Sequence, residues 1–139
     1  MTQAAQGSVT VLIADPDPAQ QKLLSDCLSP RFRVIAASTL AAASQMIAQY
    51  RPGVLLLELD MPDGDGKQLI RQIRASPTLR SMKIGCVTRR SAVRDKIEGF
   101  QVGADDYVVK PINDKMFVWR VVLLLKTCLL YTSPSPRDS

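Results

Sequence analysis

The sequence predicts an α/β fold, in which a doubly wound parallel sheet of five strands is covered by five helices. Five short apolar runs recur along the 139 residues, and segments with the apolar spacing of helices separate them. The run at residues 54–57 is wholly aliphatic, which is typical of a strand buried on both faces. Strands that alternate with helices pair in parallel, because right-handed crossovers then cover both faces of the sheet.

The first half of the chain supplies the first two strands, at residues 9–14 and 33–37, with a helix after each. Pro18 suits the first turn of a helix, because its fixed φ matches the helix and its missing N–H needs no partner there. Ser38 or Thr39 can accept a hydrogen bond from the backbone where the second helix begins.

The third strand ends at Glu58, and a turn-rich segment leads from it to Gly66, where the third helix opens. That helix stops before Pro77, because the residue that precedes a proline avoids helical geometry. The remaining elements are strands at residues 83–88 and 106–109, a helix that Ser91 can cap and Gly103 can close, and a last helix from Asn113 or Asp114 to about Lys126.

Composition excludes several classes of function. The chain has no histidine, which removes histidine metal sites and Ser-His or Cys-His catalysis. The net charge is +5, but the basic residues are scattered, so we expect no nucleic-acid binding by this domain. Three cysteines without CxxC spacing indicate reduced thiols and a cytoplasmic location. We expect no membrane association, since no signal peptide is visible and no segment has the roughly 20 apolar residues of a span.

Carboxylates and a lysine stand at the ends of the predicted strands, where open α/β sheets place their sites. Residues 58–66, Glu-Leu-Asp-Met-Pro-Asp-Gly-Asp-Gly, resemble the Asp-Leu-x-Met-Pro-Asp-x-Asp-Gly signature of response regulator receiver domains. Residues 103–107, Gly-Ala-Asp-Asp-Tyr, and the Lys-Pro pair at 110–111 are also similar to that family. The resemblance covers residues 9 to about 126.

This resemblance implies a flavodoxin-like sheet with strand order 2-1-3-4-5 and a role for each matching residue. Glu58 stands where the family has the aspartate that accepts a phosphoryl group. Thr88 matches the family's switch hydroxyl, Tyr107 its aromatic switch residue and Lys110 its fixed cation. In the family the peptide bond before the proline that follows this lysine is cis, so we expect a cis bond before Pro111.

Two positions depart from the family's pattern. Asp15 and Pro16 match its acidic pair, so the second position offers no ligand, and the side chain of Asp17 starts one residue later. Glu58 is longer than the family's aspartate by one methylene. Because Mg²⁺ tolerates little distortion from octahedral geometry, we expect weak magnesium binding or none, with Asp15 and Asp60 as candidate ligands, and no other cofactor.

The same residues also have interpretations without a switch. Glu58 is either inert and paired with Lys110, or a partial imitation of a phosphorylated aspartate, since it carries one negative charge against roughly two for a phosphate. Phosphorylation of Glu58 itself ranks third. Thr88 is common in strands, and Tyr107 can serve packing alone. The nearby acidic residues fail the calcium-loop pattern and are interpreted as turn formers and a helix cap: Asp60, Asp63 and Asp65.

The last predicted helix is apolar almost all round, whereas a surface helix shows a single apolar stripe. Either its outer face binds a partner, or it continues into a further domain. In receiver domains this helix, the fourth helix and the fifth strand commonly form the dimer or output surface. The resemblance therefore implies other signalling proteins, the chain's own output domain or a homodimer as partners. The alternative is that Phe117 and Val118 are scattered exposed apolar residues.

We divide the chain into a disordered N-terminus at residues 1–8, a receiver-like domain at 9–127 and a foreign tail at 128–139. The tail shows no helical or strand periodicity, and residues 128–138 resemble the translation of a transposon-end sequencing adapter. On that interpretation the natural chain stops being visible near Lys126 or Thr127, and it stays open whether a downstream output domain is missing.

The sequence thus favours a receiver-like domain of a bacterial two-component or phosphorelay response regulator. We interpret it as a pseudo-receiver, which acts as a phosphorylation-independent interaction or regulatory module and not as an enzyme. The alternative is a ligand-binding or enzymatic protein on a flavodoxin-like fold. A flavin phosphate would need backbone donors after the first strand, and Asp15, Pro16 and Asp17 would repel it.

Overall fold

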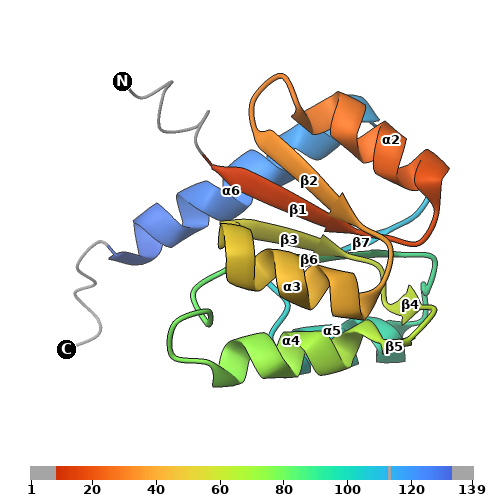
Figure 1. Ribbon diagram of the computed structural model, residues 1–139, viewed down its shortest axis with the longest axis vertical. Coiled ribbons are helices and arrows are strands. Elements are labelled where there is room, and N and C mark those ends of the chain that lie inside the picture. The colour runs from red at the N-terminus through yellow and green to blue at the C-terminus, as the bar shows by residue number, and fades with distance from the viewer. Residues whose placement is uncertain (1–8, 113, 133–139) are drawn as a thin grey trace.

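The computed structural model describes residues 9–112 and 114–132. Five parallel strands form one sheet in the order β2-β1-β3-β6-β7, which is 2-1-3-4-5 when only the strands of this sheet are counted (Figure 1). The predicted fold class is therefore confirmed. The predicted disordered N-terminus, Asn113 and residues 133–139 of the predicted foreign tail lie outside the described residues.

The elements follow the predicted alternation closely. The strands of the sheet are β1 (Thr10–Ala14), β2 (Arg33–Ala37), β3 (Val54–Leu57), β6 (Lys83–Thr88) and β7 (Asp106–Val109). The helices are α2 (Pro18–Leu28), α3 (Leu40–Tyr50), α4 (Gly66–Ala75), α5 (Val93–Val102) and α6 (Asp114–Thr132). A small antiparallel hairpin, formed by β4 (Asp60–Met61) and β5 (Gly64–Asp65), lies between β3 and α4.

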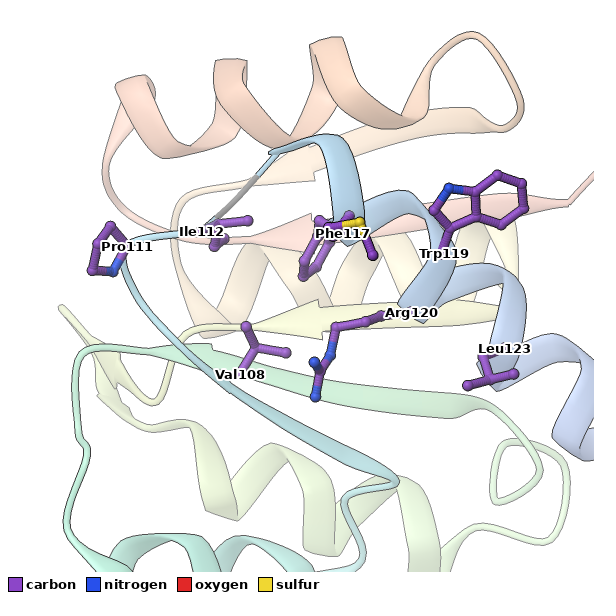
Figure 2. Close-up of a pocket in the computed structure, with 8 residues that line it drawn as sticks. Val108, Pro111, Ile112, Phe117, Trp119, Arg120 and Leu123 are labelled. Atoms are coloured by element: carbon purple, nitrogen blue, oxygen red, sulfur yellow. The ribbon is translucent and has the colours of Figure 1, made fainter.

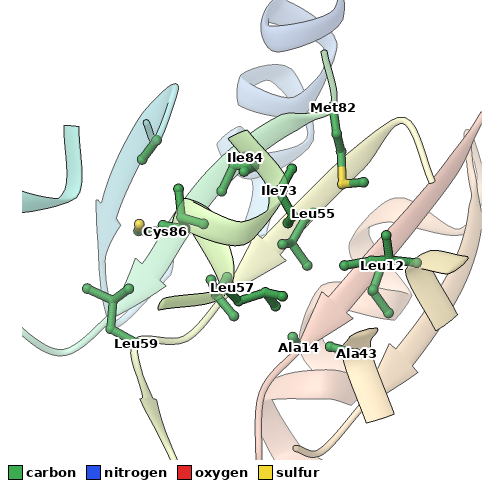
Figure 3. Close-up of a cluster of buried hydrophobic side chains, with 14 of the residues drawn as sticks. Leu12, Ala14, Ala43, Leu55, Leu57, Leu59, Ile73, Met82, Ile84 and Cys86 are labelled. Atoms are coloured by element: carbon green, nitrogen blue, oxygen red, sulfur yellow. The ribbon is translucent and has the colours of Figure 1, made fainter. Parts of the chain in front are cut away.

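Helices cover both faces of the sheet. Figure 1 shows α3, α4 and α5 on one side and α2 and α6 on the other. Alternate residues of each strand point to opposite sides, so Leu55 and Leu57 join the cluster under α3, α4 and α5 (Figure 3). Val54 and Leu56 join the second cluster, under α2 and α6. Both faces of β3 are thus buried, as its unbroken aliphatic run predicted.

The ends of the helices confirm some predicted caps and correct one. Pro18 is the first residue of α2, and Thr39, not Ser38, caps α3 by accepting from the backbone N–H of Ala42 at 3.0 Å. The predicted cap by Ser91 is wrong. Ala92 occupies that position and has no side chain able to accept a hydrogen bond, so this end of α5 lacks a side-chain cap.

Two further differences concern segments with weak sequence signals. The β4–β5 hairpin was not predicted, because strands of two residues are too short to show alternation. Helix α6 extends to Thr132, past the predicted end near Lys126, because no proline or glycine interrupts the chain before residue 134. Within the described residues, none of the helices combines the length and apolarity that crossing a membrane requires.

Candidate functional site

The register of the sheet brings Asp15 and Glu58 side by side. The last paired residues of β1 and β3 are Ala14 and Leu57, and the two carboxylates each follow one step later. The backbone N–H of Glu58 donates to the carbonyl of Ala14 at 2.9 Å, which extends the pairing beyond the assigned strand. Both carboxylates therefore stand at the carboxyl edge of the sheet, after the central strand β3 and its neighbour β1.

Lys110 reaches the same place from the end of β7. Its backbone N–H donates to the carbonyl of Thr88 at 2.9 Å, so it too stands one step beyond the last paired residue of its strand. The peptide bond between Lys110 and Pro111 is cis, as expected from the resemblance. This geometry directs the lysine across the edge of the sheet toward β1 and β3.

The three side chains converge in one buried ion cluster. The Nζ atom of Lys110 lies 2.8 Å from Oδ2 of Asp15 and 2.8 Å from Oε1 of Glu58. The exposed fractions are 2% for Asp15, 6% for Glu58 and 8% for Lys110. Two carboxylates and one ammonium group leave one net negative charge, removed from water and held together by direct contacts.

Burial alone would lower the pKa of Lys110, because the charged form loses its hydration. The hydrogen bonds that Lys110 donates to Asp15 and Glu58, with the attraction of their charges, outweigh that cost and hold the pKa of Lys110 above its usual value. The lysine therefore remains a cation throughout the physiological range and serves as the fixed positive charge of this cluster.

The outer oxygens of the two carboxylates also have partners. Oδ1 of Asp15 accepts a hydrogen bond from the backbone N–H of Asp17 at 2.9 Å. Oε2 of Glu58 accepts one from the backbone N–H of Asp60 at 3.0 Å. All four carboxylate oxygens are thus hydrogen-bonded by groups of the chain itself, which is the condition for burying such charges without a large penalty.

Asp17 does not belong to this cluster, contrary to its assignment to an acidic pocket. Its side chain is exposed and accepts from the backbone N–H of Ala19 at 2.9 Å, which caps α2. Pro16 is also exposed. The physical reason is its position immediately before Pro18, where its carboxylate satisfies a helix N–H that would otherwise be unpaired.

Thr88 and Tyr107 both contact the segment that follows β6. The hydroxyl of Thr88, fully buried, accepts from the backbone N–H of Arg90 at 3.3 Å. The hydroxyl of Tyr107 donates to the carbonyl of Arg90 at 2.9 Å. Burial, assisted by Asp95, raises the pKa of Tyr107 to about 12, so its hydroxyl remains a donor at neutral pH.

Asp60, a candidate metal ligand, instead holds an arginine that sequence reasoning missed. The guanidinium of Arg90 donates to Oδ1 of Asp60 through Nε at 3.0 Å and through Nη2 as well. This hydrogen bond lowers the pKa of Asp60 against the opposing effect of its partial burial. Arg90 is the second of two arginines after Thr88, and no local pattern marks it as a site residue.

The other acidic residues of the hairpin shape the backbone. Asp65 caps α4 by accepting from the backbone N–H of Lys67 at 2.9 Å, as predicted. Asp63 accepts from the backbone N–H groups of Leu40 and Ala41, at 2.8 and 3.0 Å, and these bonds lower its pKa. Asp63 thus ties the hairpin to the start of α3, a contact that its position in the sequence does not indicate.

The donor set does not fit a divalent cation as it stands. Among the residues that the structure describes, no group of three or more histidine, cysteine, aspartate or glutamate side chains could hold a metal ion. The two carboxylates that do meet, Asp15 and Glu58, both bind the ammonium group of Lys110. A magnesium ion needs several oxygen ligands in near-octahedral geometry, and the side chain of Pro16 supplies none.

The family of response regulator receiver domains matches residues 11–121. This chain belongs to that family. The receiver domain is 30% identical to the response regulator PleD of Caulobacter vibrioides over 133 residues, which are 95% of this chain and 29% of PleD. It is 35% identical to the response regulator MprA of Mycobacterium ulcerans over 86% of this chain and 51% of MprA.

Solved structures agree with this assignment. A response regulator from Chloroflexus aurantiacus is 30% identical, with a TM-score of 0.81 over 86% of this chain and 98% of the other. The chain thus spans less than a third of the length of PleD and about half of the length of MprA. The sequence left two function classes open, and these matches support the signalling module. The chain is the receiver domain of a two-component response regulator.

A second surface feature lies beside the last strand and helix. A groove of about 250 Å³ lies between Val108 of β7 and the helix α6, and Trp119 and Leu123 also line it. Figure 2 shows the side chains that line it. Phe117, which the sequence offered as a scattered exposed residue, is 2% exposed and belongs to the core, and Val118 is partly buried. Among the α6 side chains that the structure describes, at residues 116–126, the large apolar ones that are exposed are Met116, Trp119 and Leu123.

Proposed function

We propose that this receiver domain acts without accepting a phosphoryl group, as a phosphorylation-independent interaction or regulatory module. The observation that carries the proposal is the closed ion cluster at the acceptor position. Both oxygens of Glu58 are already bonded, one to Lys110 and one to the backbone N–H of Asp60. Hydrogen bonds on both oxygens stabilise the carboxylate and make it a weaker nucleophile toward a phosphorus atom.

Charge supports the same conclusion. Transfer of a phosphoryl group requires positive charge to offset the anionic donor, and receiver-like sites obtain it from a divalent cation and a lysine. Here Lys110 is committed to two carboxylates, and Pro16 removes a ligand position. We therefore propose that Mg²⁺ binds weakly or not at all, and that the paired cluster is inert rather than an imitation of a phosphorylated state.

The direct test is incubation of the purified protein with acetyl phosphate and Mg²⁺, followed by intact-mass analysis. We expect no species with an added mass of about 80 Da, the increment of one phosphoryl group. A stable adduct that maps to Glu58 would overturn the proposal.

Restoring the family's residues should restore the chemistry in two steps. We expect Glu58→Asp alone to become labelled only slightly, because Pro16 still deprives a metal ion of a ligand. The combination Glu58→Asp with Pro16→Asp should be labelled to a much greater extent under the same conditions. Equal labelling of the single and double variants would contradict the role assigned to Pro16.

We further propose that the domain dimerises through α5, β7 and α6. Strand β7 is an edge of the sheet, and exposed apolar side chains lie on the two helices beside it. They are Val93, Ile97 and Phe100 on α5, and Met116, Trp119 and Leu123 on α6. An arrangement of apolar residues around an unpaired edge is typical of an association surface.

Light scattering after size exclusion tests this dimer. Leu123→Glu, which places a charge on a side chain that is 62% exposed, should shift the protein toward monomer. Tyr50→Glu is the matched control, because Tyr50 is 44% exposed and ends α3, which covers the opposite face of the sheet from α6. A wild-type protein that remains monomeric at high concentration would exclude the homodimer and favour a different partner. We also propose a cytoplasmic location, as the reduced thiols suggest.

A further inference from the structure

Arg90 contacts three residues beside the Glu58 cluster, each through a different group. Its guanidinium binds Asp60, its backbone N–H donates to the hydroxyl of Thr88, and its carbonyl accepts from the hydroxyl of Tyr107. Asp60 in turn donates its backbone N–H to Glu58. One residue therefore lies between the acceptor position and the two residues that the sequence matched to the family's switch.

The side chain of Arg90 forms the outer part of this arrangement. Besides Asp60, its guanidinium has Asp65 at 3.8 Å and Asp95 at 4.0 Å. Three carboxylates thus surround one guanidinium, two from the hairpin that follows β3 and one from the first turn of α5. This cluster bridges the hairpin to the segment between β6 and α5.

The backbone of Arg90 forms the inner part. The Tyr107 hydroxyl donates a hydrogen bond to the Arg90 carbonyl. The ring of Tyr107 is itself confined by its neighbours. A Cβ placed on Gly99 would come within 3.1 Å of the ring, and the ring centroid of Phe100 lies 6.4 Å away. The position of Tyr107 is therefore coupled to α5, whose residues Val93, Ile97 and Phe100 are exposed.

The start of α5 depends on these contacts more than the starts of α2, α3 and α4 do on theirs. Thr39 and Asp65 cap α3 and α4 with their side chains, and Asp17 caps α2. Ala92 provides no such bond for α5. A helix start without a side-chain cap frays more readily, so external contacts decide how long it stays formed.

We propose that Arg90 is a latch that joins the Glu58 cluster to the N-terminal end of α5 and holds both in one arrangement. We define the Arg90 latch as Arg90 with Asp60, Thr88 and Tyr107. The regulatory role of the Arg90 latch rests on the proposed function. In that role, charges of the chain itself fix the arrangement that a phosphoryl group would otherwise control. Arg90 is a positioning residue and takes no part in any transfer.

The solvent exposure of the Asp60–Arg90 ion pair determines how much the latch can change local opening. The side chain of Asp60 is 62% exposed and that of Arg90 25% exposed, so solvent weakens their ion pair. A pair of this kind, or a single hydrogen bond such as that of Tyr107, changes a local opening equilibrium by a factor of about 3 to 10. The latch therefore biases one region and leaves global unfolding almost unchanged.

Hydrogen exchange of residues 88–97, measured by mass spectrometry on the full chain without any phosphodonor, tests the latch. Arg90→Ala and Asp60→Asn should each raise exchange in this segment by a factor of about 3 to 10, and Tyr107→Phe should do so independently. Arg89→Ala is the matched control, because Arg89 is an exposed arginine one residue earlier. It should leave the exchange unchanged.

A double-variant comparison separates the latch from a general loss of local structure. If Asp60 and Arg90 act through one contact, Asp60→Asn in the Arg90→Ala background should add nothing. Effects that multiply, or single variants that exchange as slowly as wild type, would overturn the proposal. Labelling of Glu58 by acetyl phosphate would overturn the proposed function instead, and it would leave this exchange pattern intact.

Discussion

Lys110 is the residue on which the acidic edge of the sheet depends. It supplies the single positive charge shared by Asp15 and Glu58, both almost fully buried. Breaking a buried ion cluster by removing one partner is much more costly than never having formed it, because the remaining charges stay desolvated. The ammonium group therefore contributes to folding as well as to the chemistry of the site.

Replacing Lys110 by methionine should reduce the free energy of unfolding by about 3 to 5 kcal/mol at neutral pH, since two adjacent buried carboxylates are then uncompensated. Urea denaturation followed by circular dichroism measures this change. Lys22→Met is the matched control. Lys22 forms an ion pair with Asp26 on the surface of α2, with side chains 77% and 67% exposed, so its loss should cost about 0.3 to 0.5 kcal/mol.

The pH dependence gives a second check on the same residue. The pKa of Lys110 is raised in the folded state, so the stability it contributes is complete below the unfolded value of about 10.4 and is lost as pH rises through the folded value. Wild type should therefore lose stability in that alkaline window, and Lys110→Met should lack this component. An identical alkaline loss in both proteins would contradict the assigned role.

At the same residue scale, strand register made part of the site predictable. Asp15, Glu58 and Lys110 follow strands that the apolar runs identify, and parallel strands bring their carboxyl ends to one edge. Arg90 and Asp63 were not predictable in this way. Their partners lie 30 and 22 to 23 residues away, and only the folded loops bring them together.

At the scale of elements, the β4–β5 hairpin is held from both sides. Asp63 binds the start of α3, and Asp60 binds Arg90 in front of α5. The turn residues of this segment were predicted, but their partners were not, because turn chemistry specifies backbone shape and not what a carboxylate then contacts. The wrong cap by Ser91 has a related cause: several residues near a helix start satisfy the same pattern.

Arg74, near the end of α4, connects three segments. Its guanidinium donates to the carbonyl oxygens of Gly103, Arg80 and Met82, at 2.8, 2.8 and 2.6 Å, and to Asp105 at 2.8 Å. These acceptors belong to the connection between α4 and β6 and to the connection between α5 and β7. One side chain thus fixes two loops at the amino ends of the strands, opposite to the end where Glu58 lies.

We expect Arg74→Ala to lower the free energy of unfolding by at least about 2 kcal/mol, because backbone carbonyls that it satisfies lose their partner. Thermal denaturation compared with Arg71→Ala gives the contrast, since Arg71 is an exposed residue of the same helix. A change no larger than that of Arg71→Ala would show that water replaces these hydrogen bonds without cost.

At the scale of the whole molecule, the sheet separates two apolar clusters, and adjacent residues of β3 belong to different ones. Leu55 packs with the cluster under α3, α4 and α5, and Leu56 with the cluster under α2 and α6. The overall fold was predictable for this reason. Continuous apolar strands between amphipathic helices leave few arrangements other than a covered parallel sheet.

If the clusters form one cooperative unit, Leu55→Ala and Leu56→Ala should each lower the free energy of unfolding by about 2 to 5 kcal/mol. Each variant should still show a single transition that far-ultraviolet circular dichroism and tryptophan emission report at the same denaturant concentration. Transitions that separate in either variant would show that the two faces unfold independently.

The position of Trp119 has a practical consequence for fluorescence measurements on this protein. It is the sole indole of the chain, and its ring faces the guanidinium of Arg31 at 5.1 Å. Arg31 precedes β2 and so stands toward the edge of the sheet away from Glu58, while the indole itself lines the groove beside β7. Its emission intensity should therefore change when a partner binds against α6. It should not change when metal ions are added and bind at the acidic cluster. A spectroscopic probe for the cluster has to be installed there by substitution.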